Sequence, residues 1–416
     1  MAHLLIIELP GGNDTDIIEA AVRLGHSFVF LTQDINVYQR DAKVYQWVRR
    51  ADAMVVCSSF DERAVEVEVL SAHGNKAFDA VLCLIDIRLI EAARLAQRLD
   101  LPYLNTESAK LLRDKYSVRT CLRNAGIAQP EFALATTNAE IHGAVTAVGL
   151  PVLIKPSDGY GSQNIITITS EDELEFHQDD LQHLLPFATD YGLGVRSNDR
   201  LLVERYMSGV FLGCDTFSLN GQHHLLGVNE KLMFDRPSFA IRGGCFTPND
   251  GRWANLEGYL FNILDAVHFN CGAAHIEIMV TAQGPRLVEI NPRLVGAKIA
   301  RLMSFALNES VHEALINLHL GQWCIDTLDV AHFRPAATRW LSSPASGRLK
   351  SIELPSWRDA AVKCVEILKH PGDHVSTPYE NAHRLGYVMT CSDDPQQAQA
   401  VAERFIRDTQ VLIDDA

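Results

Sequence analysis

The most informative segment of the chain reads HIEIMVTAQGPRLVEINPR and covers residues 275–293. Two runs of β-favouring residues flank a Gly-Pro pair, which predicts two antiparallel strands joined by a tight turn. If the turn is centred on Gln283, antiparallel pairing places Glu277 directly opposite Glu289. Asn291 lies two residues further along the second strand, so its side chain shares the face of the two carboxylates.

Facing carboxylates need an explanation, because two of them about 5 Å apart on one sheet face repel each other. A divalent cation reverses the sign of this interaction, since carboxylate and amide oxygens are the ligands that magnesium prefers. Glu277, Glu289 and Asn291 are therefore candidate metal ligands. The alternatives are a solvated sheet face and a pair neutralised by Arg286 or Arg293. The spacing alone does not distinguish these possibilities.

A second candidate site is the segment IKPSDGYGSQN, residues 154–164. It joins the strand-like runs 152–155 and 164–168, which we interpret as a β-hairpin. Its glycines would let backbone amides approach an anion closely, and Lys155 would supply a positive charge. It is not a Walker A loop, because no Lys-Ser or Lys-Thr follows the second glycine. Taken alone, the segment fits an ordinary hairpin loop better than a phosphate site.

Composition limits the class of protein. The chain has 416 residues, too many for one core, and we expect two or three domains. Its net charge of −15 disfavours nucleic acid and anionic membranes as partners. Its 9 cysteines include no C-x-x-C pair, which indicates reduced thiols in a cytoplasmic protein rather than disulfides or a zinc site. The first residues do not resemble a signal peptide, and no apolar run is long enough to span a membrane.

Three regions differ in their residue pattern. Residues 1–110 alternate short apolar runs with amphipathic stretches, as in an open α/β sheet. Residues 111–330 contain both candidate sites, and we divide them at about residue 200 into a small part, 113–200, and a large part, 201–330. Residues 331–416 look like a small α+β domain.

The candidate sites belong to a set of motifs that together resemble the ATP-grasp superfamily. In chain order these motifs are Asp114-Lys115, Lys155 with 159–162, 202–209, Glu277, and 289–293. Within the superfamily the chain is most similar to the bacterial L-amino-acid ligases, on the segments 229–231, 291–296 and 371–375. The resemblance implies an α/β and α+β protein with a Rossmann-like N-terminal domain, a two-subdomain core that grips ATP, and a small C-terminal lid.

The resemblance also implies a function for each matching residue. The phosphates of ATP would be contacted by Lys115, Lys155, Gly159, Tyr160, Gly161 and Ser162. The nucleotide would further be bound by Lys231 and by a hinge strand that reads adenine through its backbone, namely Glu204, Arg205, Tyr206 and Met207. Magnesium, for which manganese could substitute, would be held by Glu277, Glu289 and Asn291. Catalysis would involve Lys155, Gly296 and Arg293, the arginine stabilising the oxyanion of a tetrahedral intermediate.

Weaker candidates for substrate contacts are Arg242, His275 and Ala297. Arg242 stands in a loop where the amino-acid ligases often offer a glutamate to the amino group of the first substrate. One substrate would then carry an extra acidic group or lack a free amine at that point. His275 shares the strand face of Glu277, although a structural histidine fits equally well. Asp215 is a weak candidate for the ribose contact, because no glutamate follows the hinge where the family often has one.

The implied reaction is an ATP-dependent ligation of a carboxylate to an amine through an acyl phosphate, with ADP and phosphate as products. The implied partners are small-molecule acids and amines, with amino acids foremost, and homodimers are common in the resembled family. Two alternatives remain open. One is an ATP-grasp carboxylase that phosphorylates bicarbonate, and the other is a nucleotide-binding regulator that keeps the fold without turnover.

Overall fold

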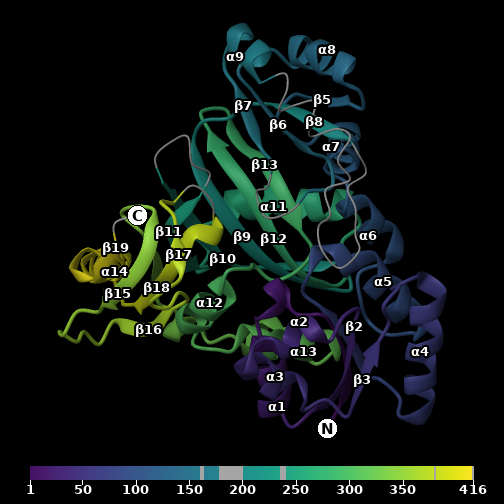
Figure 1. The fold of residues 1–416 in the computed structure, drawn as a ribbon. Coiled ribbons are helices and arrows are strands. Elements are labelled where there is room, and N and C mark those ends of the chain that lie inside the picture. Colours follow the sequence, from purple (N-terminus) through teal and green to yellow (C-terminus); the bar gives the residue numbers. More distant parts are fainter. Residues whose placement is uncertain (160–163, 178–199, 235–239, 379–380, 415–416) are drawn as a thin grey trace.

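The computed structural model describes residues 1–159, 164–177, 200–234, 240–378 and 381–414. Figure 1 shows a parallel sheet near the N-terminus, a small antiparallel sheet at the opposite end, and a long twisted sheet between them. Among the described residues, none of the helices combines the length and the apolarity that crossing a bilayer requires.

The N-terminal sheet is parallel, with the strand order β3-β2-β1-β4. Its strands are β1 (His3–Ile7), β2 (Ser27–Thr32), β3 (Ala53–Val56) and β4 (Ala80–Cys83). The helices of this region are α1 (Asp16–Arg23), α2 (Asn36–Gln39), α3 (Ala42–Val48), α4 (Glu62–Asn75), α5 (Leu89–Arg98) and α6 (Thr106–Leu112). All five residues of β1 are buried, as expected for a central strand covered on both faces.

A four-stranded antiparallel sheet follows, with the order β5-β8-β6-β7. Its strands are β5 (Phe132–Ala135), β6 (Val152–Pro156), β7 (Ile166–Ile168) and β8 (Leu201–Arg205), and its helices are α8 (Asn138–Val148) and α9 (Glu171–Phe176). The pairing of β6 with β7 confirms the predicted hairpin around the glycine-bearing loop. Helix α7 (Lys115–Asn124) precedes this sheet and begins at Asp114, whose side chain accepts a hydrogen bond from the Tyr116 N–H.

The largest sheet has eight strands in the order β13-β12-β9-β10-β11-β14-β18-β16. They are β9 (Val210–Leu219), β10 (Gln222–Met233), β11 (Ile241–Pro248), β12 (Gly272–Thr281), β13 (Gly284–Asn291), β14 (Ala336–Ser342), β16 (Val362–Ile367) and β18 (Arg384–Cys391). The helices that accompany it are α11 (Ala254–Ala266), α12 (Ile299–Leu307), α13 (Val311–His319) and α14 (Pro395–Asp408). Antiparallel pairing of β11 with β14 joins the C-terminal strands to this sheet.

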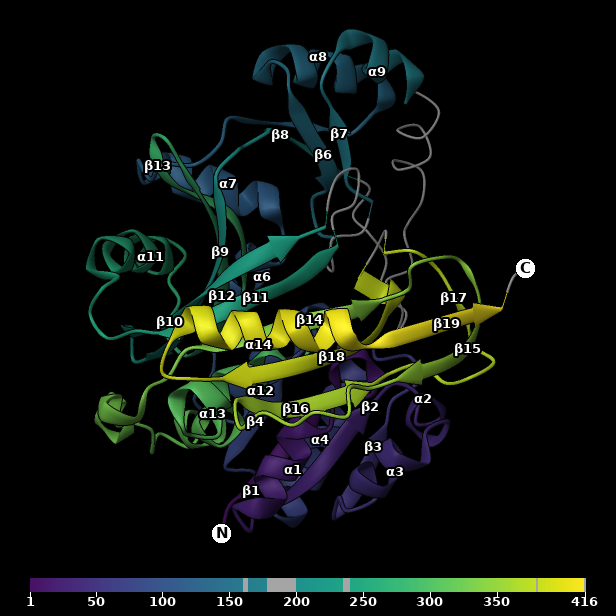
Figure 2. The ribbon, with the colours of Figure 1, turned by 90° about the vertical axis from the view of Figure 1, so that its left-hand side faces the viewer.

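A three-stranded sheet completes the C-terminal region and consists of β15 (Gly347–Glu353), β17 (His374–Val375) and β19 (Gln410–Asp414). Helix α14 packs on β14 and β18 (Figure 2). Its residue Ala398 shares a small buried cluster with Ala337 of β14. The division of the chain near residues 110 and 330 stays a prediction, since the large sheet continues across the second boundary.

Candidate nucleotide and metal site

Strands β12 and β13 form the predicted acidic hairpin. Their register pairs Glu277 with Glu289, so the prediction that the two residues lie opposite each other is confirmed. The turn itself differs from the expectation, because Thr281 pairs with Gly284 and only two residues lie between them. A regular ladder continued from that turn would have paired Glu277 with Val288. The register instead skips Val288, which forms a β-bulge.

The bulge allows β13 to place side chains both in the hydrophobic core and in the candidate site. Leu287 and Ile290 are buried in the same hydrophobic cluster, which also contains Ile276 and Ile278 of β12. Residues three apart in a regular strand point to opposite faces, so one extra residue is needed to bring both side chains into the core. The bulge supplies that residue, and Glu289 is thereby turned to the face that carries Glu277.

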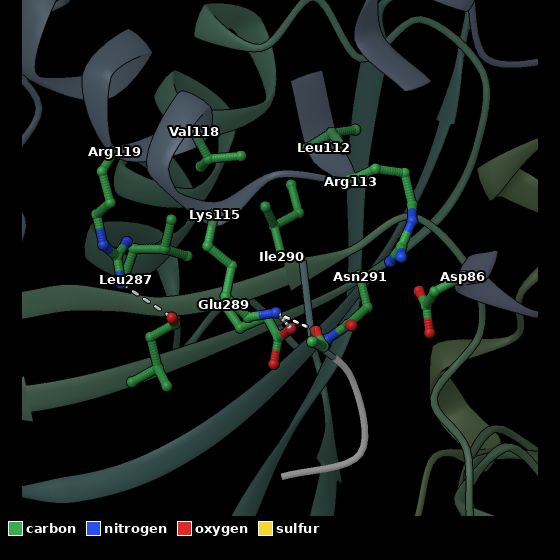
Figure 3. Close-up of a pocket in the computed structure, with 12 residues that line it drawn as sticks. Asp86, Leu112, Arg113, Lys115, Val118, Arg119, Leu287, Glu289, Ile290 and Asn291 are labelled. Carbon is green, nitrogen blue, oxygen red and sulfur yellow. Dashed lines mark hydrogen bonds and ion pairs between the residues drawn. The ribbon is translucent and has the colours of Figure 1, made fainter. Parts of the chain in front are cut away.

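Each carboxylate of the pair is held by a lysine. Lys115, at the start of α7, places its Nζ 2.8 Å from Glu289 Oε1 and also donates to the Gly159 carbonyl (Figure 3). Lys231 of β10 donates to Glu277 Oε1. The two ammonium groups therefore offset the repulsion between the carboxylates, in place of Arg286 or Arg293. Burial alone would raise the pKa of Glu277, but Lys231 and the neighbouring histidine outweigh it and hold that pKa well below its usual value.

His275 lies in the same polar row. Its Nδ1 is 2.9 Å from Asp215 Oδ1, and its Nε2 is 3.2 Å from Lys231 Nζ and 3.5 Å from Glu277 Oε1. Burial lowers the pKa of His275, but the carboxylates of Asp215 and Glu277 together outweigh burial and the net shift is upward. Asp215 is only 2% exposed and one of its oxygens contacts the His275 ring, so the structure gives no support to its proposed contact with a ribose.

A buried charged triad lies beside the hairpin and consists of Arg119, Lys155 and Glu204. Glu204 Oε1 is 2.5 Å from Arg119 Nε, and its Oε2 is 2.6 Å from Lys155 Nζ. Burial raises the pKa of Glu204, but the two cations outweigh burial and lower the pKa to about 2. Burial holds the pKa of Lys155 below its ordinary value in spite of Glu204. The predicted phosphate lysine is thus fixed by a carboxylate partner.

Arg293 follows β13 and reaches the N-terminal region. Its Nε and one terminal nitrogen lie 2.7 and 2.6 Å from Asp86 Oδ2. The alternative in which Arg293 forms an ion pair with Glu277 or Glu289 is therefore wrong. Asp86 lines the same pocket as Lys115, Glu289 and Asn291 (Figure 3). Burial raises the pKa of Asp86, but Arg293 outweighs burial and holds the pKa below its ordinary value.

Three family models match the chain: the ATP-grasp N-terminal domain over residues 18–103, the ATP-grasp domain over 148–301, and L-amino acid ligase C-terminal domain 2 over 339–414. The chain is an ATP-grasp protein. The L-amino acid ligase of Bacillus licheniformis has a similar structure, with a TM-score of 0.82 and 18% sequence identity, covering 100% of this chain and 99% of that one.

Two related sequences extend the comparison. An uncharacterized protein of Sinorhizobium fredii, y4rH, is 26% identical over 97% of this chain and 81% of its own length. The L-arginine-specific L-amino acid ligase of Bacillus subtilis is 24% identical over 70% of each chain. The fold class predicted from the sequence is confirmed, with its parallel N-terminal sheet, its ATP-grasp core and its C-terminal α+β part.

The predicted hinge of this ATP-grasp protein, Glu204–Met207, consists of the last two residues of β8 and the two residues that follow. The backbone N–H groups of Arg205 and Tyr206 donate to the carbonyls of Glu131 and Pro151, both at 2.9 Å. The Arg205 guanidinium donates to the Leu150 carbonyl at 2.8 Å. Glu204 itself pairs with Phe132 and Leu153, so three of the four hinge residues are anchored to the neighbouring chain segments. Tyr160, Gly161 and Ser162, predicted to cover the phosphates, lie outside the described residues.

The loop after Arg293 has an unusual backbone. Ala297 and Lys298 have φ angles of 56° and 61°, a left-handed conformation that non-glycine residues rarely adopt. Lys298 Nζ lies 2.7 Å from Asp14 Oδ1 and 3.5 Å from Asp16 Oδ1, both in the N-terminal region. These ion pairs hold the loop that contains Gly296 and Ala297. Contacts of these two residues with the substrate or the reacting groups stay predictions.

Arg242 lies at the start of β11 and is 43% exposed, with its guanidinium 3.3 Å from Glu403 of α14. The substrate contact predicted for it would compete with this ion pair. Lys231 has a cation–π contact with the Phe211 ring in addition to its bond with Glu277.

The donor set of the hairpin fits a hard divalent cation. Glu277, Glu289 and Asn291 present two carboxylates and one amide oxygen on a single face, which is the chemistry that magnesium selects. No group of three or more histidine, cysteine or carboxylate side chains suited to a metal occurs in the part of the chain that the structure describes. Few protein side chains would therefore coordinate a cation at this hairpin. Nucleotide phosphates and water would supply its remaining ligands.

Two residues of the site, Asp86 and Arg119, were not predicted from the sequence. Asp86 follows β4, and loops at the carboxyl ends of parallel strands are where open sheets bind ligands, so its position was a usable signal. Arg119 lies four residues after Lys115 on α7, which places both side chains on one helix face. That spacing could have identified it.

Proposed function

We propose that this protein is an ATP-dependent ligase that joins a carboxylate to an amine, with amino acids or amino-acid-like acids as substrates. The observation that carries the proposal is the facing pair Glu277 and Glu289, each beside a lysine, with Glu289 lining the pocket that contains Asp86. The match to L-amino acid ligase C-terminal domain 2 supports the same substrate class.

The lysines would bind and neutralise the phosphates of ATP. Lys115 is well placed for this, because it can exchange its contact with Glu289 for a phosphate oxygen. Lys155 would bring a charge whose position is already fixed by Glu204. Glu277, Glu289 and Asn291 would hold magnesium, which when bound supplies charge neutralisation and orientation of the phosphates.

The adenine would be read by backbone groups of the hinge. Since the N–H groups of Arg205 and Tyr206 already donate within the sheet, we propose the N–H of Met207 as the donor to the base. Glu204 would not contact the base with its side chain, because both carboxylate oxygens are engaged by Arg119 and Lys155.

The chemistry would take two steps. A carboxylate oxygen of the first substrate attacks the γ-phosphorus, and ADP leaves with the bridging oxygen. The amine nitrogen of the second substrate then attacks the acyl carbon, phosphate leaves with the bonding pair, and the nitrogen loses a proton. Arg293 would stabilise the oxyanion of the intervening tetrahedral intermediate, an effect of about 3–4 kcal/mol in comparable sites. Asp86 would orient the guanidinium for this purpose.

The decisive test is a phosphate-release screen of amino-acid pairs with ATP and magnesium. The proposal expects release that requires both an acid and an amine, with ADP as the nucleotide product. AMP and pyrophosphate would indicate adenylation and would refute the acyl phosphate. Release with bicarbonate but no amine would favour a carboxylase, and ATP binding without release would favour a regulator. A cytoplasmic location and a homodimer belong to the same proposal, and light scattering tests the second of these.

A further inference from the structure

The Val288 bulge has a dedicated hydrogen-bond donor. A terminal nitrogen of Arg119 donates to the Val288 carbonyl at 2.9 Å (Figure 3). The residue skipped by a bulge is left out of the strand pairing, so its backbone groups need other partners when they are buried. A guanidinium from α7 supplies one of them.

The same guanidinium is fixed on its other side. Its Nε bonds Glu204 at 2.5 Å, and the backbone carbonyl of Arg119 accepts a bond from Gln129 Nε2 at 2.7 Å. Arg119 is 2% exposed and is one of the largest fully buried side chains of the protein. Its planar fork can therefore hold Glu204 and the bulge at a set separation, which a lysine with one flexible ammonium would not do.

These contacts link the two halves of the candidate site. Glu204 belongs to the four-stranded sheet and fixes Lys155, whereas Val288 belongs to the acidic hairpin of the large sheet. We propose that Arg119 is a positioning residue that holds the Val288 bulge, keeps Glu289 opposite Glu277, and so sets the affinity of the hairpin for a divalent cation. The inference rests on the metal site of the proposed function.

A purely structural explanation makes a different prediction. If Arg119 only neutralises Glu204, its replacement should lower the stability of the protein without a specific effect on the cation. If Arg119 holds the bulge, the cation should be affected even in a variant that keeps a positive charge beside Glu204. Residues that support metal ligands from behind typically change metal affinity by about 10–100-fold when they are replaced.

The first experiment measures Mn²⁺ binding to the ATP complex by electron paramagnetic resonance, which requires no turnover. For Arg119→Lys we expect affinity for Mn²⁺ to fall by about tenfold or more, while ATP affinity without metal changes by less than about threefold. The matched control is Arg123→Lys, one turn further along α7, where the guanidinium is exposed and lies over the Phe132 ring. The control should change Mn²⁺ affinity by less than about twofold. A folded Arg119→Lys protein that binds Mn²⁺ like the wild type would overturn the inference.

The second experiment removes the bulge. Deleting Val288 leaves Leu287, Glu289 and Ile290 in regular alternation, so Glu289 keeps its place opposite Glu277 without a bulge. In this background Arg119→Lys should alter Mn²⁺ affinity by less than about twofold, because no bulge remains to be held. A persistent tenfold loss would mean that Arg119 acts through Glu204, and the inference would fail.

Failure of the proposed function and failure of the inference about Arg119 would give different results. If the wild-type protein with ATP binds no Mn²⁺, the metal site and with it the proposed function are refuted. If the wild type binds Mn²⁺ but no amino-acid pair supports phosphate release, the ligase assignment fails and the inference about Arg119 stands.

Discussion

The ion pair between Asp86 and Arg293 yields the sharpest prediction about stability and activity together. A hydrogen bond of 2.7 Å from Arg293 Nε and an ion-pair contact of 2.6 Å from a terminal nitrogen both end on one carboxylate oxygen, and Asp86 is 7% exposed. Removing one partner of a buried pair costs about 3–5 kcal/mol. An asparagine can still accept one of these bonds, so we expect Asp86→Asn to lose about 2–3 kcal/mol of unfolding free energy at pH 7.

The same substitution should reduce kcat, because Arg293 keeps its charge but loses its fixed direction. Complete removal of an oxyanion donor costs about 100–1000-fold, so we expect a loss of about tenfold for a donor that is present but misaligned. Urea unfolding and steady-state phosphate release measure the two effects. Since the folded-state pKa of Asp86 is depressed, its contribution is present above the ordinary value of 3.8 and is lost as pH falls below it.

An exposed pair provides the contrast. Glu313 accepts a bond of 2.7 Å from Arg23, but these side chains are 27% and 54% exposed. Glu313→Gln should therefore cost less than about 1 kcal/mol and leave kcat unchanged. If Asp86→Asn behaved like this variant in both assays, the reasoning from burial and from the orientation of Arg293 would be refuted.

Four further predictions follow from the site and its surroundings. Glu289→Gln should abolish turnover with little change in the thermal unfolding temperature, because it removes a ligand charge and no core volume; near-normal phosphate release would contradict the metal assignment. Gly213→Ala should lower kcat, since a Cβ there would lie 2.6 Å from the His275 ring; a crystal structure would show the ring displaced. Burial lowers the pKa of His319 from 6.5 to about 4, so unfolding free energy should decrease by up to about 3 kcal/mol as pH falls through that window, and less in His319→Gln, as measured by urea unfolding. Arg242→Ala should shift preference away from acidic substrates; unchanged selectivity in competition assays would remove Arg242 from the substrate site.

Part of the site could be predicted because it depends on local pattern. The opposition of Glu277 and Glu289 follows from strand alternation and a short turn, and α7 begins where Asp114 signals a helix cap. The predicted centre of the turn, Gln283, is half a residue beyond the observed centre between Ala282 and Gln283. The extra residue of the bulge offsets this difference, so Glu277 still pairs with Glu289. Leu287 and Ile290 are both apolar and three residues apart, a spacing that places both in the core only if the strand contains a bulge. This spacing could have predicted the bulge, whereas strict alternation could not.

Other features depend on how distant segments dock. Asp86 and Arg293 are 207 residues apart, and their pairing requires the N-terminal sheet to lie against the loop after β13. Nothing in the periodicity of either segment specifies that arrangement. The same holds for β14, which pairs with β11 across a long stretch of intervening chain. Such pairings are fixed by the packing of whole sheets and not by local residue preference.

The continuous ladder from β11 to β14 restricts which part of the molecule can swing during a catalytic cycle. Four residue pairs, from Gly243 with Arg339 to Phe246 with Ala336, would have to break before the C-terminal strands could rotate away from the acidic hairpin. The four-stranded sheet of β5 to β8 shares no strand pairing with the eight-stranded sheet among the residues described. Opening and closing over a nucleotide should therefore be carried by the β5–β8 unit, pivoting about the point where Arg119 joins Glu204 to Val288, and hydrogen exchange should slow in this unit first when ATP is added.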